Sequence, residues 1–339
     1  MSHPHLYQFA TFNGTAWSTI SSVPLDRTVS EISCPTDNVC VASGGLGYND
    51  SALTFNGTAW STAVIIDPFN GLTSISCPSA AFCMTVDTAG QMVTYNGATW
   101  SAPTGAVAPR GGLSAVSCAS ATRCVGVTHD GSAVVFDGTA WSVSTLVATF
   151  PWLTSISCPT NNFCVAVDSQ GNSYTFNGTT WAANRILPST DEGMQASVSC
   201  PSTTFCVATG LGYAAIFNGV SWAASTRIDT TSGTLDVSCA SANFCAAVTG
   251  TGNFHTFDGS HWTDGTLIGA NTPLTAVSCP TSGFCAAVSY SGEVTTFNGL
   301  TWDVPTRIDG QNEMVGLSCP TVDFCAIVDA SGRAIIGSS

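Results

Sequence analysis

Sixteen cysteines carry the most regular spacing in this sequence of 339 residues. They form eight pairs whose members lie six residues apart, and successive pairs are separated by 39 to 43 residues. Two thiols at this spacing can form a disulfide if a turn brings the ends of adjacent strands together. Zinc is the alternative, but its ligands usually lie about two to four residues apart, and the five histidines are scattered. The predicted disulfides join Cys34 to Cys40, Cys77 to Cys83, Cys118 to Cys124, Cys158 to Cys164, Cys200 to Cys206, Cys239 to Cys245, Cys279 to Cys285 and Cys319 to Cys325.

An aromatic motif repeats with the same period. Each unit contains an aromatic residue, Asn or Asp, Gly, two further residues and Trp. These tryptophans are Trp17, Trp60, Trp100, Trp141, Trp181, Trp222, Trp262 and Trp302. They could be eight platforms for stacking sugars, but a position kept by one spacing in every unit is more simply a packing position between units.

The elements that must position these residues are short strands. In residues 153–187, taken as a representative unit, the pattern predicts strands at 153–158, 163–168, 172–176 and 180–186. Pro159 marks the turn after the first strand, because proline cannot continue a central ladder. Asn177-Gly178 is typical of the tight hairpin between the third and fourth strands. Four short strands in about 40 residues are typical of a propeller blade.

The sequence therefore predicts an all-β, eight-bladed β-propeller with four antiparallel strands and one disulfide in each blade. We expect one domain over residues 1–339, with blades at 28–67, 72–106, 113–147, 153–187, 195–228, 234–268, 274–308, and 314–337 plus 6–21. The last blade must combine both ends of the chain, which removes the free sheet edges of an open array. Residues 332–337 and 6–12 both fit its third strand, so one of the two is expected to be redundant or displaced.

Three aspartates lie three residues before a recurring glycine. In Asp87, Asp168 and Asp329 the carboxylate can cap the amides of the following turn. Calcium is the alternative ligand, but it would require several converging carboxylates, and each loop offers one. We therefore favour turn capping.

Composition excludes several classes of protein. The chain has 7 basic residues, all of them Arg, against 21 acidic residues, for a net charge of -14, which argues against nucleic acid as a partner. No apolar run approaches the roughly 18 residues of a membrane-spanning helix, so we expect no membrane insertion. Residues 1–5 do not have the pattern of a signal sequence, and we expect a mature form from which that sequence is absent. The N-terminus can be natural or engineered. Disulfides imply an oxidising compartment, so we expect a secreted, extracellular protein. We also expect a monomer without a cofactor.

At this level the sequence resembles the β-propeller repeats, rich in Cys pairs and Asn-Gly-x-x-Trp turns, of exported proteins from actinobacteria and related soil bacteria. The resemblance is carried by segments such as Ser157-Cys158-Pro159 and Phe176-Asn177-Gly178-Thr179-Thr180-Trp181, and it covers essentially the whole chain. It implies an exported bacterial propeller but no shared catalytic residues. Sugar-binding propellers are similar in having many short blades with aromatic residues. This analogy suggests carbohydrate as the class of ligand.

A ligand site is expected on one face of the ring. Turns after the first and third strands are nearly uniform, whereas the crossovers between blades on the other face diverge, and divergent loops on a rigid scaffold carry binding residues. Trp152 is the one tryptophan outside the repeat and the first candidate for stacking. The candidate ligand-binding residues are Trp152, Phe150, Arg110, Arg27, Phe69, Tyr48, Asp191 and Glu192.

Carbohydrate binding without catalysis is the leading function predicted from these features. The alternative is a protein-interaction or structural scaffold module of an exported protein that uses the same face. A glycoside hydrolase or lyase is the third hypothesis, with Asp191, Glu192 and Glu313 as carboxylates and Arg27 or Arg110 as anion clamps. Nothing in the sequence places two of these carboxylates at a catalytic separation, so the enzyme hypothesis stays open but is not preferred.

Overall fold

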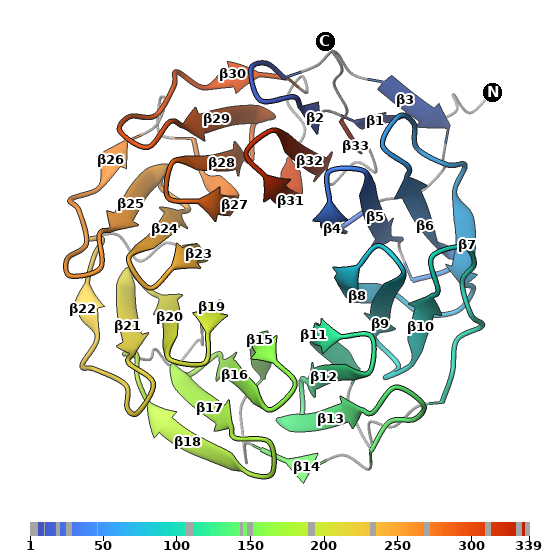
Figure 1. Cartoon of the computed structure of the whole chain (residues 1–339), viewed down its shortest axis with the longest axis horizontal. Coiled ribbons are helices and arrows are strands. Elements are labelled where there is room, and N and C mark those ends of the chain that lie inside the picture. Colours follow the sequence, from blue (N-terminus) through green and yellow to red (C-terminus); the bar gives the residue numbers. More distant parts are fainter. Residues whose placement is uncertain are drawn as a thin grey trace.

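The strands form a closed ring of eight blades (Figure 1). The computed structural model describes residues 6–9, 11–17, 21–24, 29–45, 47–105, 112–142, 145–147, 152–188, 194–230, 235–267, 272–308, 313–329 and 334–335. All regular elements in these ranges are β-strands, which confirms the predicted all-β propeller. Among the residues so described, no helix is long and apolar enough to cross a membrane.

The first seven blades place their strands in chain order from the ring centre outward. The innermost strands are β4 (Glu31–Thr36), β8 (Leu72–Ser79), β11 (Leu113–Ser120), β15 (Leu153–Thr160), β19 (Ser197–Ser202), β23 (Leu235–Ser241), β27 (Leu274–Thr281) and β31 (Met314–Thr321). The second strands are β5 (Val39–Gly44), β9 (Phe82–Asp87), β12 (Arg123–Thr128), β16 (Phe163–Asp168), β20 (Phe205–Gly210), β24 (Phe244–Thr249), β28 (Phe284–Ser289) and β32 (Phe324–Asp329). The strands β31 and β32 take the first two positions of the last blade.

The outer strands are shorter. The third strands are β6 (Asp50–Phe55), β10 (Met92–Tyr95), β13 (Ser132–Phe136), β17 (Asn172–Phe176), β21 (Tyr213–Phe217), β25 (Asn253–Phe257) and β29 (Glu293–Phe297). The fourth strands are β7 (Val64–Asp67), β14 (Thr145–Leu146), β18 (Trp181–Arg185), β22 (Thr226–Arg227), β26 (Thr266–Leu267) and β30 (Thr306–Arg307). In the second blade, isolated bridges from Tyr95 to Trp100 and from Met92 to Thr104 take the place of a fourth strand.

Both ends of the chain build the third strand of the last blade. The strand β2 (Thr11–Phe12) pairs with Ala326 and Cys325 of β32, and β33 (Ala334–Ile335) pairs with the next two residues of β32, Val328 and Ile327. Neither end is redundant, because each fills half of one strand position. A separate pair, β1 (Leu6–Phe9) with β3 (Ser21–Pro24), lies beside this blade (Figure 1). The ring is therefore closed by pairing residues from opposite ends of the sequence.

The innermost strands continue past the position where the sequence predicted a turn. In the representative blade β15 runs to Thr160, two residues beyond Cys158 and through Pro159. The pairing register with β16 shifts between Ser157 and Thr160, which marks a β-bulge. A bulge leaves residues without a ladder partner, so proline is tolerated there without a lost hydrogen bond.

Disulfides close the first hairpin of every blade. All eight predicted pairs are bonded, and within each pair the Cα atoms lie 3.9–4.2 Å apart. Each bond closes a short loop, for which chain entropy predicts a stabilisation of about 2 kcal/mol. No free cysteine occurs among the described residues, and the array of bonds indicates an oxidising environment.

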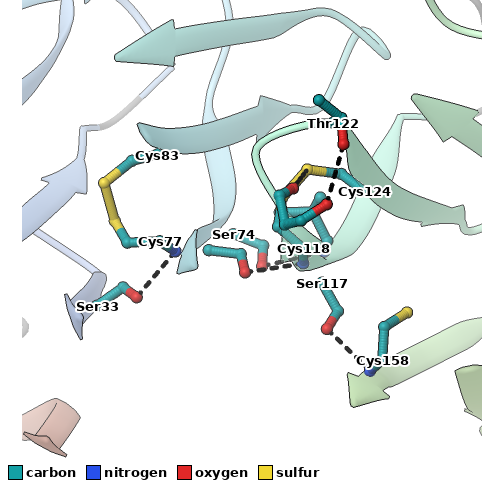
Figure 2. The surroundings of a disulfide bond; sticks show 12 residues. Ser33, Ser74, Cys77, Cys83, Ser117, Cys118, Thr122, Cys124 and Cys158 are labelled. Carbon is teal, nitrogen blue, oxygen red and sulfur yellow. Dashed lines mark hydrogen bonds between the residues drawn. A yellow bond between two sulfur atoms is a disulfide. The ribbon is translucent and has the colours of Figure 1, made fainter. Parts of the chain in front are cut away.

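A belt of hydrogen bonds joins the blades near the centre of the ring. A serine precedes the first cysteine of every unit, and its Oγ accepts a hydrogen bond of 3.0–3.1 Å from the backbone N–H of the corresponding cysteine in the next blade. Figure 2 shows two of these bonds, from Cys77 N to Ser33 and from Cys158 N to Ser117. The bond from Cys34 N to Ser318 closes the belt. We call these eight bonds the serine belt.

The hydrophobic core is a ring of clusters between neighbouring blades. Between the third and fourth blades, for example, Val127 of β12 packs with Leu153, Ala166 and Phe176. The second strands are buried on both faces, which explains their continuous runs of small and branched apolar residues. Such runs let adjacent sheets approach closely on either side.

Removing one serine of the belt should weaken the contact between two blades. In Ser157→Ala the N–H of Cys200 loses its acceptor, and the free energy of unfolding should fall by about 1–3 kcal/mol. Guanidinium unfolding of the oxidised protein measures this change. Ser221→Ala, at an exposed serine in a hairpin turn, is the matched control and should change stability by less than about 0.5 kcal/mol. Equal stability of the two variants would contradict a structural role for the belt.

Candidate functional site

One face of the ring is uniform because its turns pack on each other. The Asn-Gly hairpin between the third and fourth strands lies on the turn between the first and second strands of the same blade. Gly178 has a φ of +95°, and a Cβ there would lie 3.3 Å from the Cβ of Asn162. Both the positive φ and the close approach favour glycine, and this constraint leaves little freedom for a variable site.

The opposite face carries the turns between second and third strands and the crossovers between blades; it is called the crossover face below. Backbone hydrogen bonds hold its turns and crossovers together. Ser169 N, in the turn of the fourth blade, donates to the carbonyl of Trp152 in the preceding crossover, and Ile186 N in the next crossover donates to the carbonyl of Gly171. Side chains on this face therefore project from loops whose backbones are fixed by hydrogen bonds.

The repeated aromatic residues are packing residues. Every repeat Trp lies against the Phe or Tyr five residues before it, with ring centroids 5.1–5.7 Å apart. These partners lie in the clusters between blades; Phe176, for example, is buried in the core beside Trp181. These contacts confirm a packing role, in which each Trp is half-buried; Trp141, Trp181 and Trp302 also line grooves on the surface.

Exposed aromatic side chains lie on the crossover face. Among the described residues, four aromatic side chains are largely exposed: Tyr48 at 70%, Phe69 at 72%, Trp152 at 64% and Tyr290 at 54%. Tyr48 and Tyr290 belong to turns between second and third strands, whereas Phe69 and Trp152 belong to crossovers. Three of the predicted ligand residues, Tyr48, Phe69 and Trp152, are thus accessible on one face.

Tyr48 and Phe69 belong to adjacent loops of the first blade. An added Cβ at Gly71, two residues after Phe69, would lie 3.7 Å from the Cα of Gly47, the residue before Tyr48. Asn70, next to Phe69, donates from Nδ2 to Oε1 of Gln91 at 3.2 Å. Two exposed aromatic rings and a pair of side-chain amides therefore occupy one region of the crossover face.

Trp152 and Tyr290 form two further groups elsewhere on the crossover face. His129 meets Trp152 edge to face, with ring centroids 5.6 Å apart. The hydroxyl of Tyr290 forms a hydrogen bond with the carboxylate of Glu313, and this bond raises the pKa of Tyr290. Glu313, considered above as a catalytic carboxylate, thus has a neighbouring tyrosine as its partner.

The remaining predicted ligand residues lie outside the described part of the chain. These are Phe150, Arg110, Arg27, Asp191 and Glu192. Their participation in a site stays a prediction, as does the hydrolase hypothesis that depends on the last two. The described residues contain no group of three or more His, Cys, Asp or Glu side chains arranged to hold a metal ion.

The predicted capping role of the turn aspartates is confirmed at two positions. Asp87 Oδ1 accepts hydrogen bonds from the backbone of Ala89 and Gln91, and Asp168 Oδ1 accepts from Gln170 and Asn172. The turn that follows Asp329 lies outside the described residues. Turn capping at Asp87 and Asp168 fixes loops of the crossover face.

A polar cavity at the ring centre contains two carboxylates that the sequence analysis missed. It has a volume of about 390 Å³ and is lined by inner-strand side chains that are mostly Ser and Thr, together with Glu31 and Asp236. Burial raises the pKa of Glu31 to about 7, and the charge of Asp236 adds to this effect. Burial also raises the pKa of Asp236, although Val277 N and Ser197 Oγ donate to its carboxylate at 3.0 Å. The signal in the sequence is an acidic residue three positions before a cysteine, where other units carry Ser, Ala or Gly.

The comparisons with known proteins support the fold. No protein-family model matches the sequence, and no curated protein matches it. Sqt1 of Chaetomium thermophilum is similar in structure, with a TM-score of 0.74 at 15% identity over 98% of this chain and 97% of that chain. The C-terminal WD40 domain of Sif2 has a TM-score of 0.71 at 9% identity over 98% of both chains. The computationally designed Ika8 protein has a TM-score of 0.71 at 11% identity over 91% of this chain and 96% of that chain. The chain is thus an eight-bladed β-propeller with a cysteine pair in each blade, and these neighbours establish its fold alone.

Titration of Glu31 should make stability depend on pH. Its folded pKa lies above the unfolded value, so the protonated form stabilises the fold below about pH 4.5, and this stabilisation is lost as pH rises to about 7. The free energy of unfolding of Glu31→Gln, relative to that of the wild type, should therefore rise by up to about 3 kcal/mol between pH 4 and pH 8. The partial exposure of the Glu31 side chain makes this value an upper limit.

Guanidinium unfolding at both pH values measures this difference. Glu293→Gln, which removes a carboxylate paired with Arg307 at the outer part of a blade, is the control. Asp236→Asn should lower the pH at which Glu31 titrates, because it removes the neighbouring charge. Parallel pH dependences in the wild type and in Glu31→Gln would show that Glu31 does not titrate in this range.

Proposed function

We propose that this chain is a non-catalytic binding propeller that takes carbohydrate on its crossover face. The observation that carries the proposal is the segregation of aromatic residues. The described aromatic side chains that are largely exposed lie on the crossover face, whereas the repeat aromatics are packed between blades. Packing accounts for the repeat aromatic residues, whereas the exposed aromatic residues have no role in the core.

The surroundings of the exposed rings favour sugars. An aromatic ring offers an apolar surface to the C–H face of a sugar, and adjacent polar groups can bind its hydroxyls. Asn70 and Gln91 lie beside Phe69, His129 lies beside Trp152, and Glu313 lies beside Tyr290. These groups belong to different blades, so a branched or repeating glycan could contact several weak sites of the protein at once.

A protein-interaction module is the second candidate. The specific observation is a groove of about 960 Å³ between the sixth and seventh blades, lined in part by Phe244, Leu300 and Val304. Leu300 and Val304 are 88% and 86% exposed. Apolar side chains at a groove are typical anchors for a partner protein, and this groove would bind on the outer part of the ring rather than on the crossover face.

We also propose that the protein is secreted and acts as a monomer. Eight disulfides suit an oxidising extracellular medium, and the resemblance to exported actinobacterial repeats points the same way. Outside the cell, a propeller with a disulfide in every blade would resist proteases while its variable loops stay accessible to a ligand.

A glycan array tests the proposal. The oxidised wild type should bind a restricted set of glycans, and Trp152→Ala or Phe69→Ala should reduce binding about tenfold, because each removes a stacking surface. Leu300→Ala, at an exposed residue away from the crossover face, is the matched control and should bind as the wild type does. Thermal melting of every variant separates loss of binding from loss of fold.

Two outcomes would contradict carbohydrate binding on this face. One is the absence of any bound glycan for a folded, fully oxidised protein. The other is glycan binding that survives both substitutions on the crossover face. Capture of one partner protein that is lost in Leu300→Ala but kept in Trp152→Ala would favour the interaction module.

A further inference from the structure

Two buried aspartates connect the crossover that carries Phe69 to the neighbouring blade. Asp67 ends β7 of the first blade, Asp87 ends β9 of the second, and both are 0% exposed. Asp67 Oδ1 accepts hydrogen bonds from Phe69 N at 2.9 Å and from Asn70 N at 3.1 Å. Asp67 thus fixes the backbone of the loop that presents Phe69.

The second oxygen of each carboxyl group is buried. Among the described residues, no N–H or O–H group donates to Asp67 Oδ2 or Asp87 Oδ2, and the two side chains lie within hydrogen-bonding reach of each other. Two carboxylates can form a hydrogen bond only if one of them keeps a proton, since ionised groups at this distance repel. One proton between the two oxygens satisfies both, so the geometry calls for a shared proton.

Among the described residues, no basic side chain forms an ion pair with either carboxylate. A further carboxyl group, that of Asp50 in β6, belongs to the residue paired across the ladder with Asp67. Its oxygens accept hydrogen bonds from Leu72 N at 2.7 Å and Gly47 N at 3.1 Å. These bonds hold Asp50 on the neighbouring strand with backbone donors of its own.

Related positions in other blades are satisfied without a proton. Asp168 caps the turn equivalent to that of Asp87, and its Oδ2 accepts from Tyr174 OH at 2.7 Å and from Asn172 Nδ2 at 2.8 Å. Asp229, at the crossover position equivalent to Asp67, lies 3.0 Å from Nε2 of His255. At the Asp67–Asp87 junction both partners are acids, so a proton replaces the donor that a side chain provides elsewhere.

We propose that the proton shared by Asp67 and Asp87 is a pH-sensitive switch that holds the crossover of Phe69 in place. Loss of the proton leaves two buried negative charges in contact, and the crossover moves away from the second blade to separate them. The shape of the surface formed by Tyr48 and Phe69 then depends on pH. Its consequence for ligand affinity rests on the carbohydrate function proposed above.

The direction of the switch follows from the protonation of Asp87. Burial, followed by the hydrogen bond with Asp67, raises the pKa of Asp87 to about 6. Because the folded value exceeds that of the unfolded chain, the proton stabilises the closed crossover fully below about pH 4, and this stabilisation is lost as pH rises through 6. Mildly acidic conditions therefore order the loop, and neutral conditions loosen it.

Hydrogen exchange at Phe69 N and Asn70 N tests the switch without any ligand. After correction for the intrinsic rate, protection in the wild type should fall on the order of tenfold between pH 5 and pH 7.5. Asp87→Asn should show equal protection at both pH values, because the amide donates to Asp67 without titrating. Asp168→Asn, the matched control in the fourth blade, should keep the wild-type pH response at Phe69.

Two results would overturn the proposal. The first is the same pH response at Phe69 in Asp87→Asn and in the wild type. The second is protection at pH 7.5 that appears with added calcium and disappears with a chelator, since a cation rather than a proton would then bind between the carboxylates.

Binding of the glycan selected on the array, measured at pH 5 and pH 7.5, tests the link to function. Binding should weaken at pH 7.5 in the wild type but not in Asp87→Asn. A glycan affinity independent of pH, together with the exchange response, would overturn the regulatory role. If no glycan binds while the exchange response is present, the proposed function fails and the proton switch stands.

Discussion

The serine belt is the interaction on which the rest of the structure depends. The innermost strand of each blade has one edge without a neighbouring strand, and the N–H groups on that edge require acceptors. The hydroxyl of a serine in the preceding blade supplies one acceptor to every first cysteine. The disulfide then connects the same cysteine to the second strand of its blade. A dipeptide such as Ser157-Cys158 in β15 therefore joins four strands in three blades, because it also bonds to the innermost strands of both neighbouring blades. The belt closes because Ser318 of β31 accepts the bond from Cys34 N of β4, which joins the last blade to the first. The composite third strand of the last blade closes the same ring farther out.

This arrangement divides the molecule into a constrained face and a variable face. Turns next to the disulfides and the Asn-Gly hairpins pack on each other, so they repeat almost unchanged. Crossovers on the other face are anchored at their ends by backbone hydrogen bonds, such as that from Tyr290 N to the carbonyl of Pro273, but their side chains are free to vary. Exposed rings at Tyr48, Phe69, Trp152 and Tyr290 appear only where the frame allows variation.

Much of the fold could be predicted from the sequence, because the determining features are local. The cysteine spacing and the Asn-Gly turns specify hairpins, and their number gives the number of blades. The closing strand could not be predicted, since residues 11–12 and 334–335 both fit one position and only three-dimensional pairing shows that they share it. The serine before each cysteine is visible as a pattern, but its acceptor role joins residues about 40 positions apart. Trp152, Phe69 and Tyr48 stand out in the sequence as departures from the repeat. Glu31 and Asp236 lie inside regularly repeated strands, and they become neighbours only when the ring closes.

The scarcity of basic residues explains how the buried acids are accommodated. With 7 arginines, no lysine and 21 acidic residues, the chain has few cations to place beside a buried carboxylate. Backbone amides take one oxygen at Asp67, Asp87 and Asp168, and the second oxygen needs another partner. That partner is a tyrosine hydroxyl at Asp168 and, at the Asp67–Asp87 junction, a second acid. The first solution does not depend on pH near neutrality, because a phenol keeps its proton there, whereas the second does. Of these three acidic caps, the pair at the Asp67–Asp87 junction thus becomes sensitive to pH through the identity of one neighbouring residue.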